Sequence, residues 1–570
     1  GVTCIGGRIV DLRLPGNNLD GPLPSSLANL EQLSFLWLSS NQISGFVQPW
    51  LGDLTALNFL YLDNNELIGP IPNALGDLPA LQWLLLQGNE IDGAIPAALG
   101  QISTLRVLRL SDNQLSGPIP AALTQLGSLE ELSARNNQLS GPLPASLGDL
   151  TALEILDLDD NEISGALPPS IGQLSNLEVL FLQRNQLTGP LPASLGSLSQ
   201  LERLFLNDNQ MSGGVPSTLG NLASVRELIL SNNPLGGNIP SSLGDLTQLE
   251  LLSLGNMGLT GGIPETIGSL SQLQGLYLFN NQLSGSLPPG LASLSNLVEL
   301  NLQANSLSGP LPNDLSELQQ LQVLWLQANG FTGTIPTSLA SLPALRDLQA
   351  VFNDFEGTLS DGPDSWSALE SLDVRYNRLA GPIPQAFGRA TDLQTLQLTG
   401  NNLTGEIPAN LLDLTALTTL NLYDNRLETD NPALIGLLDQ LNPNWQAWQT
   451  VPPGTPALAS ISSTSATIQW EGINYPLQDQ GYYQLSAEPV LGLFSDRFDG
   501  QLPVPPLTAP IQVQSNDYAQ LERIISGLSP STPYRLVIRS VTPARNDPAF
   551  PQKNTLISRP SEVIQFETLP

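Results

Sequence analysis

A period of 24 residues runs through most of the chain and constrains its fold more than any other feature. Steps of 24 from Asn17 meet asparagine at seventeen of eighteen positions, the last being Asn425, and methionine at the remaining one, Met257. No insertion or deletion interrupts the series. A unit of this length cannot bury its own apolar side chains, so successive units must stack into a solenoid.

Each unit combines a short strand with an extended or turn-like return. Residues 54–78 read LTALNFLYLDNNELIGPIPNALGDL. The leucines of the Leu-x-Leu pair point inward and the residues between them point outward. The glycine of the return permits unusual backbone angles, and the proline after it fixes φ and removes a donor. We therefore expect eighteen coils with a parallel β-sheet on the concave face and a mostly short 3-10 or irregular convex side.

The repeated asparagine is predicted to be structural. Its amide can donate to and accept from backbone groups of adjacent coils that would otherwise be unpaired. Methionine cannot donate, so we expect Met257 to leave a local defect of about 1 kcal/mol. Besides Asn17, the predicted ladder comprises Asn41, Asn65, Asn89, Asn113, Asn137, Asn161, Asn185, Asn209, Asn233, Asn281, Asn305, Asn329, Asn353, Asn377, Asn401 and Asn425.

The unit LxxLxxLxLxxNxLxGxIPxxLGxL resembles the leucine-rich repeat. Its LxGxIP half, with Leu67, Gly69 and Pro72 in the third coil, is similar to the plant-type subclass of receptor-like kinase ectodomains and polygalacturonase-inhibiting proteins. The resemblance covers residues 1–430 and implies an α/β leucine-rich-repeat solenoid. It says little about function, because the motif residues are nearly all structural.

Both ends of the solenoid carry cap-like segments. Residues 1–8, which begin GVTC, resemble the end of the plant-type N-terminal cap, and in that family Cys4 would pair with a cysteine that is missing here. Residues 431–454 contain a short apolar run, two tryptophans and a Pro-Pro-Gly break. We interpret them as a C-terminal cap and linker over the last coil.

Residues 455–570 have a different pattern, with alternating strands separated by turns. Trp470 on a second strand, and Leu528 and Tyr534 within GLSPSTPY, resemble a fibronectin type III domain. The resemblance implies an all-β sandwich that serves as a spacer or adhesive module. We find no Arg-Gly-Asp sequence in it.

Composition narrows the classes of function. The chain has 52 acidic and 20 basic residues, a net charge of −32, which argues against nucleic acid as a partner because polyanion binding needs clustered Lys and Arg. It has no histidine, the usual general base and commonest zinc ligand. We expect no enzymatic activity and no cofactor. No stretch approaches the 18 apolar residues of a membrane-spanning helix.

Variable strand positions on the concave face are the candidate ligand-binding positions, and aromatic residues recur there. Clustered exposed rings indicate a binding patch, although mutual packing beneath a cap extension explains the first group equally well. Polar residues accompany the second group, a combination that suits a sugar or a protein partner. The first group is Phe35, Trp37, Phe59, Tyr61 and Trp83, and the second is Tyr277, Phe279, Trp325, Phe352 and Tyr376.

Acidic residues concentrate in coils six to nine. Glu154, Asp157, Asp159 and Asp160 form a candidate Ca²⁺ site, because Ca²⁺ takes six to eight oxygen ligands. The spacing is not that of a dedicated calcium loop, and a solvated acidic face is the alternative.

These observations predict an extracellular or cell-surface recognition or adhesion protein without enzymatic activity, binding a protein or polysaccharide on its concave face. Two alternatives stay open. One is a structural subunit of a surface layer or filament that assembles through its repeats or its fibronectin-like region. The other is an inhibitor of a secreted hydrolase, by resemblance to the polygalacturonase-inhibiting proteins.

Overall fold

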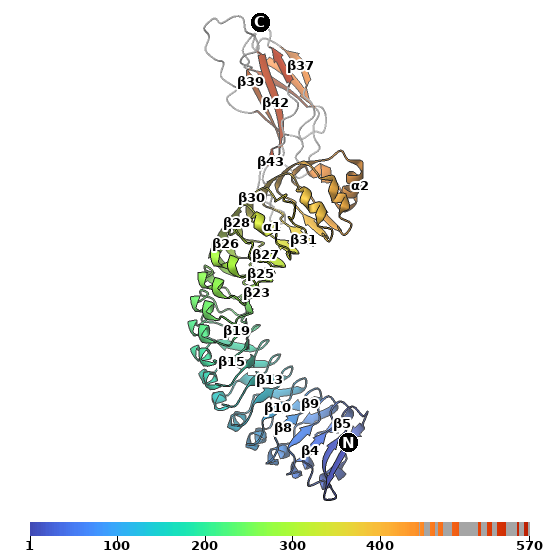
Figure 1. The fold of residues 1–570 in the computed structure, drawn as a ribbon, viewed down its shortest axis with the longest axis vertical. Helices are drawn as coiled ribbons and strands as arrows, with labels where there is room; N and C mark the ends of the chain where they lie inside the picture. The colour runs from blue at the N-terminus through green and yellow to red at the C-terminus, as the bar shows by residue number, and fades with distance from the viewer. Residues whose placement is uncertain are drawn as a thin grey trace. The chain divides into compact units, whose positions relative to one another are not determined.

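The structure is a computed structural model, shown in Figure 1. It describes residues 1–443 and 445–449, and the backbone of eight later strands between residues 457 and 567. The chain divides into two compact units. The first contains residues 1–308 and 317–321, and the second contains residues 309–316 and 322–570.

One short strand from each coil of the first unit joins a parallel sheet. Neighbouring strands pair with a shift of 24 residues, as Leu12 with Leu36 and Leu36 with Leu60. In Figure 1 the sheet follows the inner side of this unit's curve and the turns follow the outer side. Its strands are β2 (Arg8–Arg13), β4 (Phe35–Trp37), β6 (Phe59–Tyr61), β8 (Trp83–Leu85), β10 (Val107–Arg109), β12 (Glu131–Ser133), β14 (Ile155–Asp157), β16 (Val179–Phe181), β18 (Arg203–Phe205), β20 (Glu227–Ile229), β21 (Leu251–Ser253), β23 (Gly275–Tyr277) and β25 (Glu299–Asn301).

The second unit repeats this arrangement. Its parallel strands keep the same register, as Leu348 with Leu372. They are β27 (Val323–Trp325), β29 (Asp347–Gln349), β31 (Ser371–Asp373), β33 (Thr395–Gln397) and β35 (Thr419–Asn421). At the other end of the chain, β1 (Val2–Ile5) pairs antiparallel with β2, and Cys4 on it is exposed and unbridged.

The outer side of the coils consists mainly of single 3-10 turns, as the sequence predicts. The proline of each IP pair lies at the N-terminal boundary of most turns, with Pro72 at φ −72°. Glycine inside the turn allows close stacking, since a Cβ on Gly76 would lie 2.5 Å from the Ala98 carbonyl oxygen of the next coil. The turns are η1 (Ser25–Asn29), η2 (Pro49–Asp53), η3 (Asn73–Asp77), η4 (Ala97–Gln101), η5 (Ala121–Gln125), η6 (Leu147–Asp149), η7 (Pro169–Gln173), η8 (Ala193–Ser197), η9 (Ser217–Asn221), η10 (Ser241–Asp245), η11 (Glu265–Ser269), η12 (Pro289–Ser293), η13 (Gln385–Arg389) and η14 (Ala409–Asp413), with helix α1 (Thr337–Ala340) in one coil.

A second set of strands follows the asparagine in most coils, and the sequence analysis did not predict that they pair. Ser44 pairs with Glu66 and Ile68 with Glu90 in parallel register. In the first unit these lateral strands are β3 (Asp20–Pro22), β5 (Gln42–Phe46), β7 (Glu66–Pro70), β9 (Glu90–Gly93), β11 (Gln114–Gly117), β13 (Gln138–Pro142), β15 (Glu162–Gly165), β17 (Gln186–Gly189) and β19 (Gln210–Met211), then β22 (Thr260–Gly261) and β24 (Gln282–Gly285). β26 (Ser306–Gly309) pairs with β24. The second unit has β28 (Gly330–Gly333), β30 (Asp354–Gly357), β32 (Arg378–Gly381), β34 (Asn402–Glu406) and β36 (Arg426–Glu428).

The asparagine side chains join adjacent coils through backbone hydrogen bonds. Asn65 Nδ2 donates to the Leu62 carbonyl of its own coil at 3.0 Å and to the Leu38 carbonyl of the preceding coil at 3.1 Å. Its Oδ1 accepts from the Ile43 N–H at 3.0 Å. The same three contacts recur around Asn185. Each such side chain therefore satisfies backbone groups in two coils.

Met257 replaces this amide, and the backbone around it is rerouted. In a regular coil the Leu235 N–H would donate to the Oδ1 atom of an asparagine at position 257. Here it donates instead to the Asn233 carbonyl at 2.8 Å. The Leu230 carbonyl keeps its bond from Asn233. The lateral strands are interrupted here, between β19 and β22, where Pro234 contributes no N–H. The loss of the amide therefore changes the hydrogen bonding of two coils. The Leu235 N–H and the Leu230 carbonyl nevertheless both keep a partner.

The last coil is covered by helix α2 (Pro432–Leu441) and turn η15 (Trp445–Trp448). The side chains of Leu434, Leu438 and Trp445 are almost completely buried. Gln449, one period after the last asparagine, takes over the ladder. Its Nε2 donates to the Leu422 carbonyl at 2.9 Å and its Oε1 accepts from the Leu427 N–H at 3.0 Å.

The later strands form two antiparallel sheets. One has the order β37 (Ala457–Ile461), β38 (Ser465–Trp470), β41 (Leu521–Ser526). The other has the order β40 (Ile511–Gln514), β39 (Tyr482–Pro489), β42 (Pro533–Thr542), β43 (Leu556–Ile557), with β44 (Ile564–Glu567) also on β42. Leu528, from the predicted fibronectin-like motif, lies outside the described residues. Among the described helices, none is both long and apolar enough to cross a bilayer.

Candidate functional site

Five aromatic rings meet on three neighbouring strands of the concave sheet, and we call them the N-terminal aromatic cluster: Phe35, Trp37, Phe59, Tyr61 and Trp83. Phe35 lies 5.1 Å from both Phe59 and Tyr61 between ring centroids. Trp37 meets Tyr61 edge to face at 6.1 Å, and Trp83 lies 6.2 Å from Tyr61. The rings come into contact because the 24-residue register of the strands places Phe35 opposite Phe59 and Phe59 opposite Trp83.

All five rings are partly exposed, so the cluster combines mutual packing with accessible surface. Arg13 covers one edge, with its guanidinium carbon 4.2 Å from the Phe35 centroid, and is itself paired with Asp11 at 3.1 Å. Burial raises the pKa of the Tyr61 hydroxyl. The result is a partly exposed apolar surface with the Tyr61 phenol among its rings and the Arg13 guanidinium beside Phe35, an arrangement typical of protein-binding patches.

The second predicted aromatic group is divided between the two units. Tyr277 donates to Glu299 Oε2 at 2.5 Å, and Phe279 lies against Gly255, where a Cβ would be 2.4 Å from the ring. These two rings belong to the first unit, and Trp325, Phe352 and Tyr376 belong to the second.

The rings of the second unit are engaged by their own neighbours. Trp325 donates its indole N–H to Asp347 at 2.8 Å. Phe352 stacks on Tyr376 at 4.8 Å, and both have positive φ, 56° and 55°. Tyr376 is only 5% exposed, so its ring offers little surface to a ligand.

Of the four candidate calcium ligands, Asp157 and Asp159 lie within hydrogen-bonding reach of each other. Among the described residues, no group of three or more His, Cys, Asp or Glu side chains is placed to hold a metal ion. Arg184 binds Asp159 at 2.9 Å and also binds Asp160. Glu154 is exposed. The structure thus gives the calcium hypothesis no support.

One concave aromatic pair was not singled out in the sequence analysis. Phe181 and Phe205, on β16 and β18, stack with their centroids 4.5 Å apart. A sequence signal existed, because both stand four residues before a ladder asparagine, as Trp37 and Tyr61 do.

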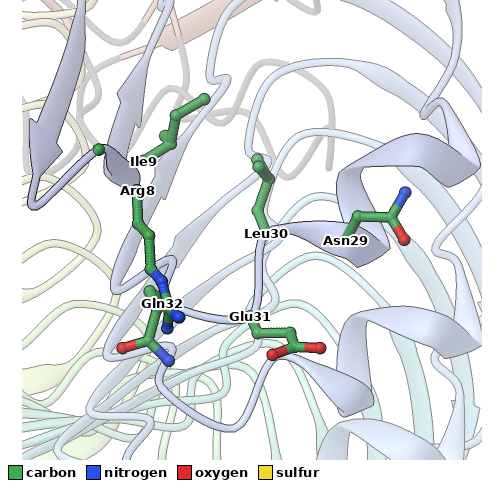
Figure 2. A pocket seen from close by; sticks show the side chains of 7 residues that line it. Arg8, Ile9, Asn29, Leu30, Glu31 and Gln32 are labelled. Carbon is green, nitrogen blue, oxygen red and sulfur yellow. The ribbon is translucent and has the colours of Figure 1, made fainter.

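Two hollows lie at the N-terminal end of the first unit. Figure 2 shows one of about 300 Å³, where Arg8 from β2 extends toward Gln32, with Glu31 nearby. A second, of about 350 Å³, is lined by leucines of the first coil, including Leu12, Leu14 and Leu19. Neither combines an enclosed apolar volume with converging catalytic side chains, as a small-molecule site would.

Leucine-rich-repeat family models match the chain in several segments. A leucine-rich repeat region model matches residues 135–238 and 232–372, and two leucine rich repeat models match residues 79–139, 366–441, 32–54 and 56–78. A search of curated proteins finds no match.

Solved structures of plant receptors match the fold. The Arabidopsis receptor kinase HAESA, in complex with the peptide hormone IDA and the co-receptor SERK1, is 35% identical, with a TM-score of 0.72 over 75% of this chain and 72% of that one. A TDR receptor is 31% identical, with a TM-score of 0.68 over 75% of this chain and 82% of that one.

The plant peptide hormone receptor RGFR1, in complex with RGF2, is 33% identical, with a TM-score of 0.65 over 75% of this chain. This chain spans 65% of the RGFR1 structure's length. The stacked 24-residue coils, the family models and these structures agree, and the chain belongs to the leucine-rich-repeat family, with a solenoid similar to plant receptor kinase ectodomains.

Proposed function

We propose that this protein is a non-enzymatic recognition protein that binds a protein or peptide on its concave face. The observation that carries the proposal is the N-terminal aromatic cluster, five partly exposed rings in mutual contact on three adjacent strands. Aromatic side chains bring large contact area at a small cost in conformational entropy, and they dominate the energetics of many interfaces.

The relatives support a ligand of this class. HAESA was solved in complex with the peptide hormone IDA and the co-receptor SERK1, and the plant peptide hormone receptor RGFR1 was solved in complex with RGF2. Their solenoids share at least 33% of aligned residues with this one. A polysaccharide is the other ligand predicted from the sequence, and rings beside amide groups also suit sugars.

We further propose an extracellular or cell-surface location and a fibronectin type III-like sandwich in residues 455–570. The location is supported by similarity to receptor ectodomains. The sandwich is supported by the two antiparallel sheets, in which β38 joins β37 to β41 while β39 joins β40 to β42. This division of sequential strands between two sheets is typical of such domains. An adhesive role, self-assembly and hydrolase inhibition stay predictions.

The proposal is tested with Trp37→Ala and Tyr61→Ala. Peptides selected from a displayed random library by the intact protein, and glycans from an array, serve as probes. We expect selected ligands to bind each variant at least tenfold more weakly, a loss of about 1.4 kcal/mol. Phe46→Ala is the matched control, because Phe46 is 54% exposed but lies on lateral strand β5. Ligands that bind the two concave variants as tightly as the parent would contradict the proposal.

A further inference from the structure

A second apolar surface lies on the concave face of the first unit, beyond the N-terminal aromatic cluster. Its side chains are neighbours in the sheet, since Phe181 lies opposite Phe205 and Phe205 lies opposite Ile229. All of them are partly exposed. We call this surface the central apolar stripe, and it consists of Ile155 on β14, Val179 and Phe181 on β16, Phe205 on β18 and Ile229 on β20.

Two strands separate the stripe from the N-terminal aromatic cluster. They are β10 and β12, whose Arg109 and Glu131 form an ion pair at 2.7 Å. Val107 on β10 is only 5% exposed, so it does not connect the two apolar surfaces. The stripe is therefore a surface of its own, and it extends about 14 Å across four strands that lie about 4.8 Å apart.

The repeat does not require apolar side chains at these positions. The core of the coils is made by inward leucines such as Leu180, which is 0% exposed. At the strand position of Phe181 and Phe205, other coils of the same unit carry Ser133 and Ser253. Contiguous apolar side chains that stay accessible and that the fold does not need are typical of an interaction surface.

A row of three glutamates borders the stripe, and we call it the glutamate row. Glu154, Glu178 and Glu202 directly precede β14, β16 and β18, one in each of three successive coils. The register places them side by side, because the Glu178 N–H donates to the Glu154 carbonyl and the Glu202 N–H donates to the Glu178 carbonyl, both at 2.8 Å. Glu154 and Glu178 are exposed, and Glu202 is partly exposed.

The nearby arginines are paired with other acids. Arg106 binds Glu130, which precedes the row by one coil, at 2.8 Å. Arg203, next to the row in sequence, binds Glu227 at 3.3 Å. Within the described part of the chain, the glutamate row itself takes part in no ion pair. Like charges on adjacent strands repel each other, so the row costs stability that a cationic partner would restore.

We propose that the central apolar stripe and the glutamate row together bind a peptide segment that carries apolar and basic side chains side by side. The inference rests on the proposed concave-face function and adds to it a second contact surface with a defined ligand chemistry. The stripe provides contact area, and the row provides charge complementary to Arg or Lys, which selects the ligand and fixes its orientation. An acidic segment would be repelled, and a neutral polysaccharide would gain little from the row.

The stripe is tested with peptides that the intact protein selects from a displayed random library. Selected peptides should combine apolar residues with Arg or Lys, and Phe205→Ser and Ile229→Ser should each weaken their binding at least tenfold. Both variants should fold, because Ser133 and Ser253 occupy the equivalent position in other coils, and thermal midpoints verify this. The matched control is Ile68→Ser, which changes a 41% exposed residue on lateral strand β7 and should bind as the parent does.

The glutamate row is tested with charge-neutral analogues of the same peptides. Replacing the peptide's Arg by citrulline, or its Lys by acetyl-lysine, should weaken binding to the parent at least tenfold. The triple variant Glu154→Gln/Glu178→Gln/Glu202→Gln should bind the charged peptide and its neutral analogue with nearly equal affinity.

A matched control separates the row from general attraction to an acidic protein. The triple variant Glu66→Gln/Glu90→Gln/Glu162→Gln removes the same charge from exposed positions on lateral strands β7, β9 and β15. It should keep the parent's preference for the charged peptide. An equal loss of preference in both triple variants would overturn the role of the row, because the attraction would then come from the net charge alone.

Failure of the two proposals can be told apart. If Trp37→Ala and Tyr61→Ala weaken binding while Phe205→Ser and Ile229→Ser bind as tightly as the parent, the stripe is wrong and concave-face recognition stands. If only the two stripe variants weaken binding, the stripe stands and the N-terminal aromatic cluster is not the contact. Selected peptides without basic residues would overturn the inferred ligand chemistry.

Discussion

Asp157 shows how a single side chain couples this solenoid to pH. Its folded-state pKa of about 7 lies above the ordinary value of 3.8, so the folded protein holds a proton that the unfolded chain releases in this interval. Because the folded state binds more protons there, the contribution of Asp157 to stability falls as pH rises from 3.8 to about 7 and then stays constant.

We predict that Asp157→Asn removes this pH dependence. The amide is neutral throughout and can donate to Asp159, so the variant should gain stability relative to the parent as pH rises, reaching its full advantage above about pH 7. Thermal midpoints of both proteins between about pH 5 and pH 8 measure the difference. A difference that does not change over this range would contradict the assignment.

Met257 and Asn89 provide a matched pair of ladder substitutions. We predict that Met257→Asn raises the free energy of unfolding by about 1 kcal/mol, by restoring amide bonds to two coils. Asn89→Met should lower the free energy of unfolding by about 1–3 kcal/mol. Asn89 Oδ1 accepts a hydrogen bond from the Leu67 N–H in the regular lateral strand β7, and the substitution leaves that N–H without its acceptor. Urea midpoints of both variants test this, and equal and opposite shifts would contradict the rerouting seen around Met257.

At the level of elements, the interrupted lateral strands mark a weak point in the first unit. Residues 234–238 lack both the regular lateral strand and a ladder asparagine in the next coil. We predict that their amides exchange with solvent at least tenfold faster than those of residues 186–190, which occupy the same positions in a regular coil containing β17. Hydrogen-exchange mass spectrometry compares the two segments directly. Equal protection would show that the rerouted bonds are as strong as the regular ones.

Elements fixed by the 24-residue period could be predicted from the sequence, and those that depend on neighbouring coils could not. The concave strands and 3-10 turns follow from the spacing of leucine, glycine and proline. The lateral strands follow from how closely successive LxG segments stack. A ladder defined by asparagine does not include Gln449, although Gln449 stands one period after Asn425. The burial of Tyr376 depends on side-chain orientation, which a repeat pattern does not encode.

We expect the C-terminal cover to stabilise the solenoid, because stacked coils are stabilised by their neighbours. Leu438 of α2 is fully buried. We predict that Leu438→Ala lowers stability by about 2–5 kcal/mol and loosens the last coils first. Leu412→Ala, which truncates a leucine that is 40% exposed, should have a much smaller effect. Hydrogen exchange measured segment by segment compares the Leu438→Ala and Leu412→Ala variants. An equal loss of stability in both variants would contradict a capping role for α2.

At the scale of the whole molecule, the net charge of −32 should govern how quickly a ligand arrives. Long-range attraction raises the association rate of an oppositely charged partner and is screened by salt over about 10 Å at 0.1 M. For a peptide ligand that contains Arg or Lys, the association rate constant should fall at least tenfold between about 10 mM and 300 mM salt, while the dissociation rate constant changes much less. Stopped-flow kinetics with a selected peptide and its citrulline or acetyl-lysine analogue test this. The neutral analogue should show a weaker salt dependence, and equal slopes for the two would mean that the net charge does not steer the basic group to the concave face.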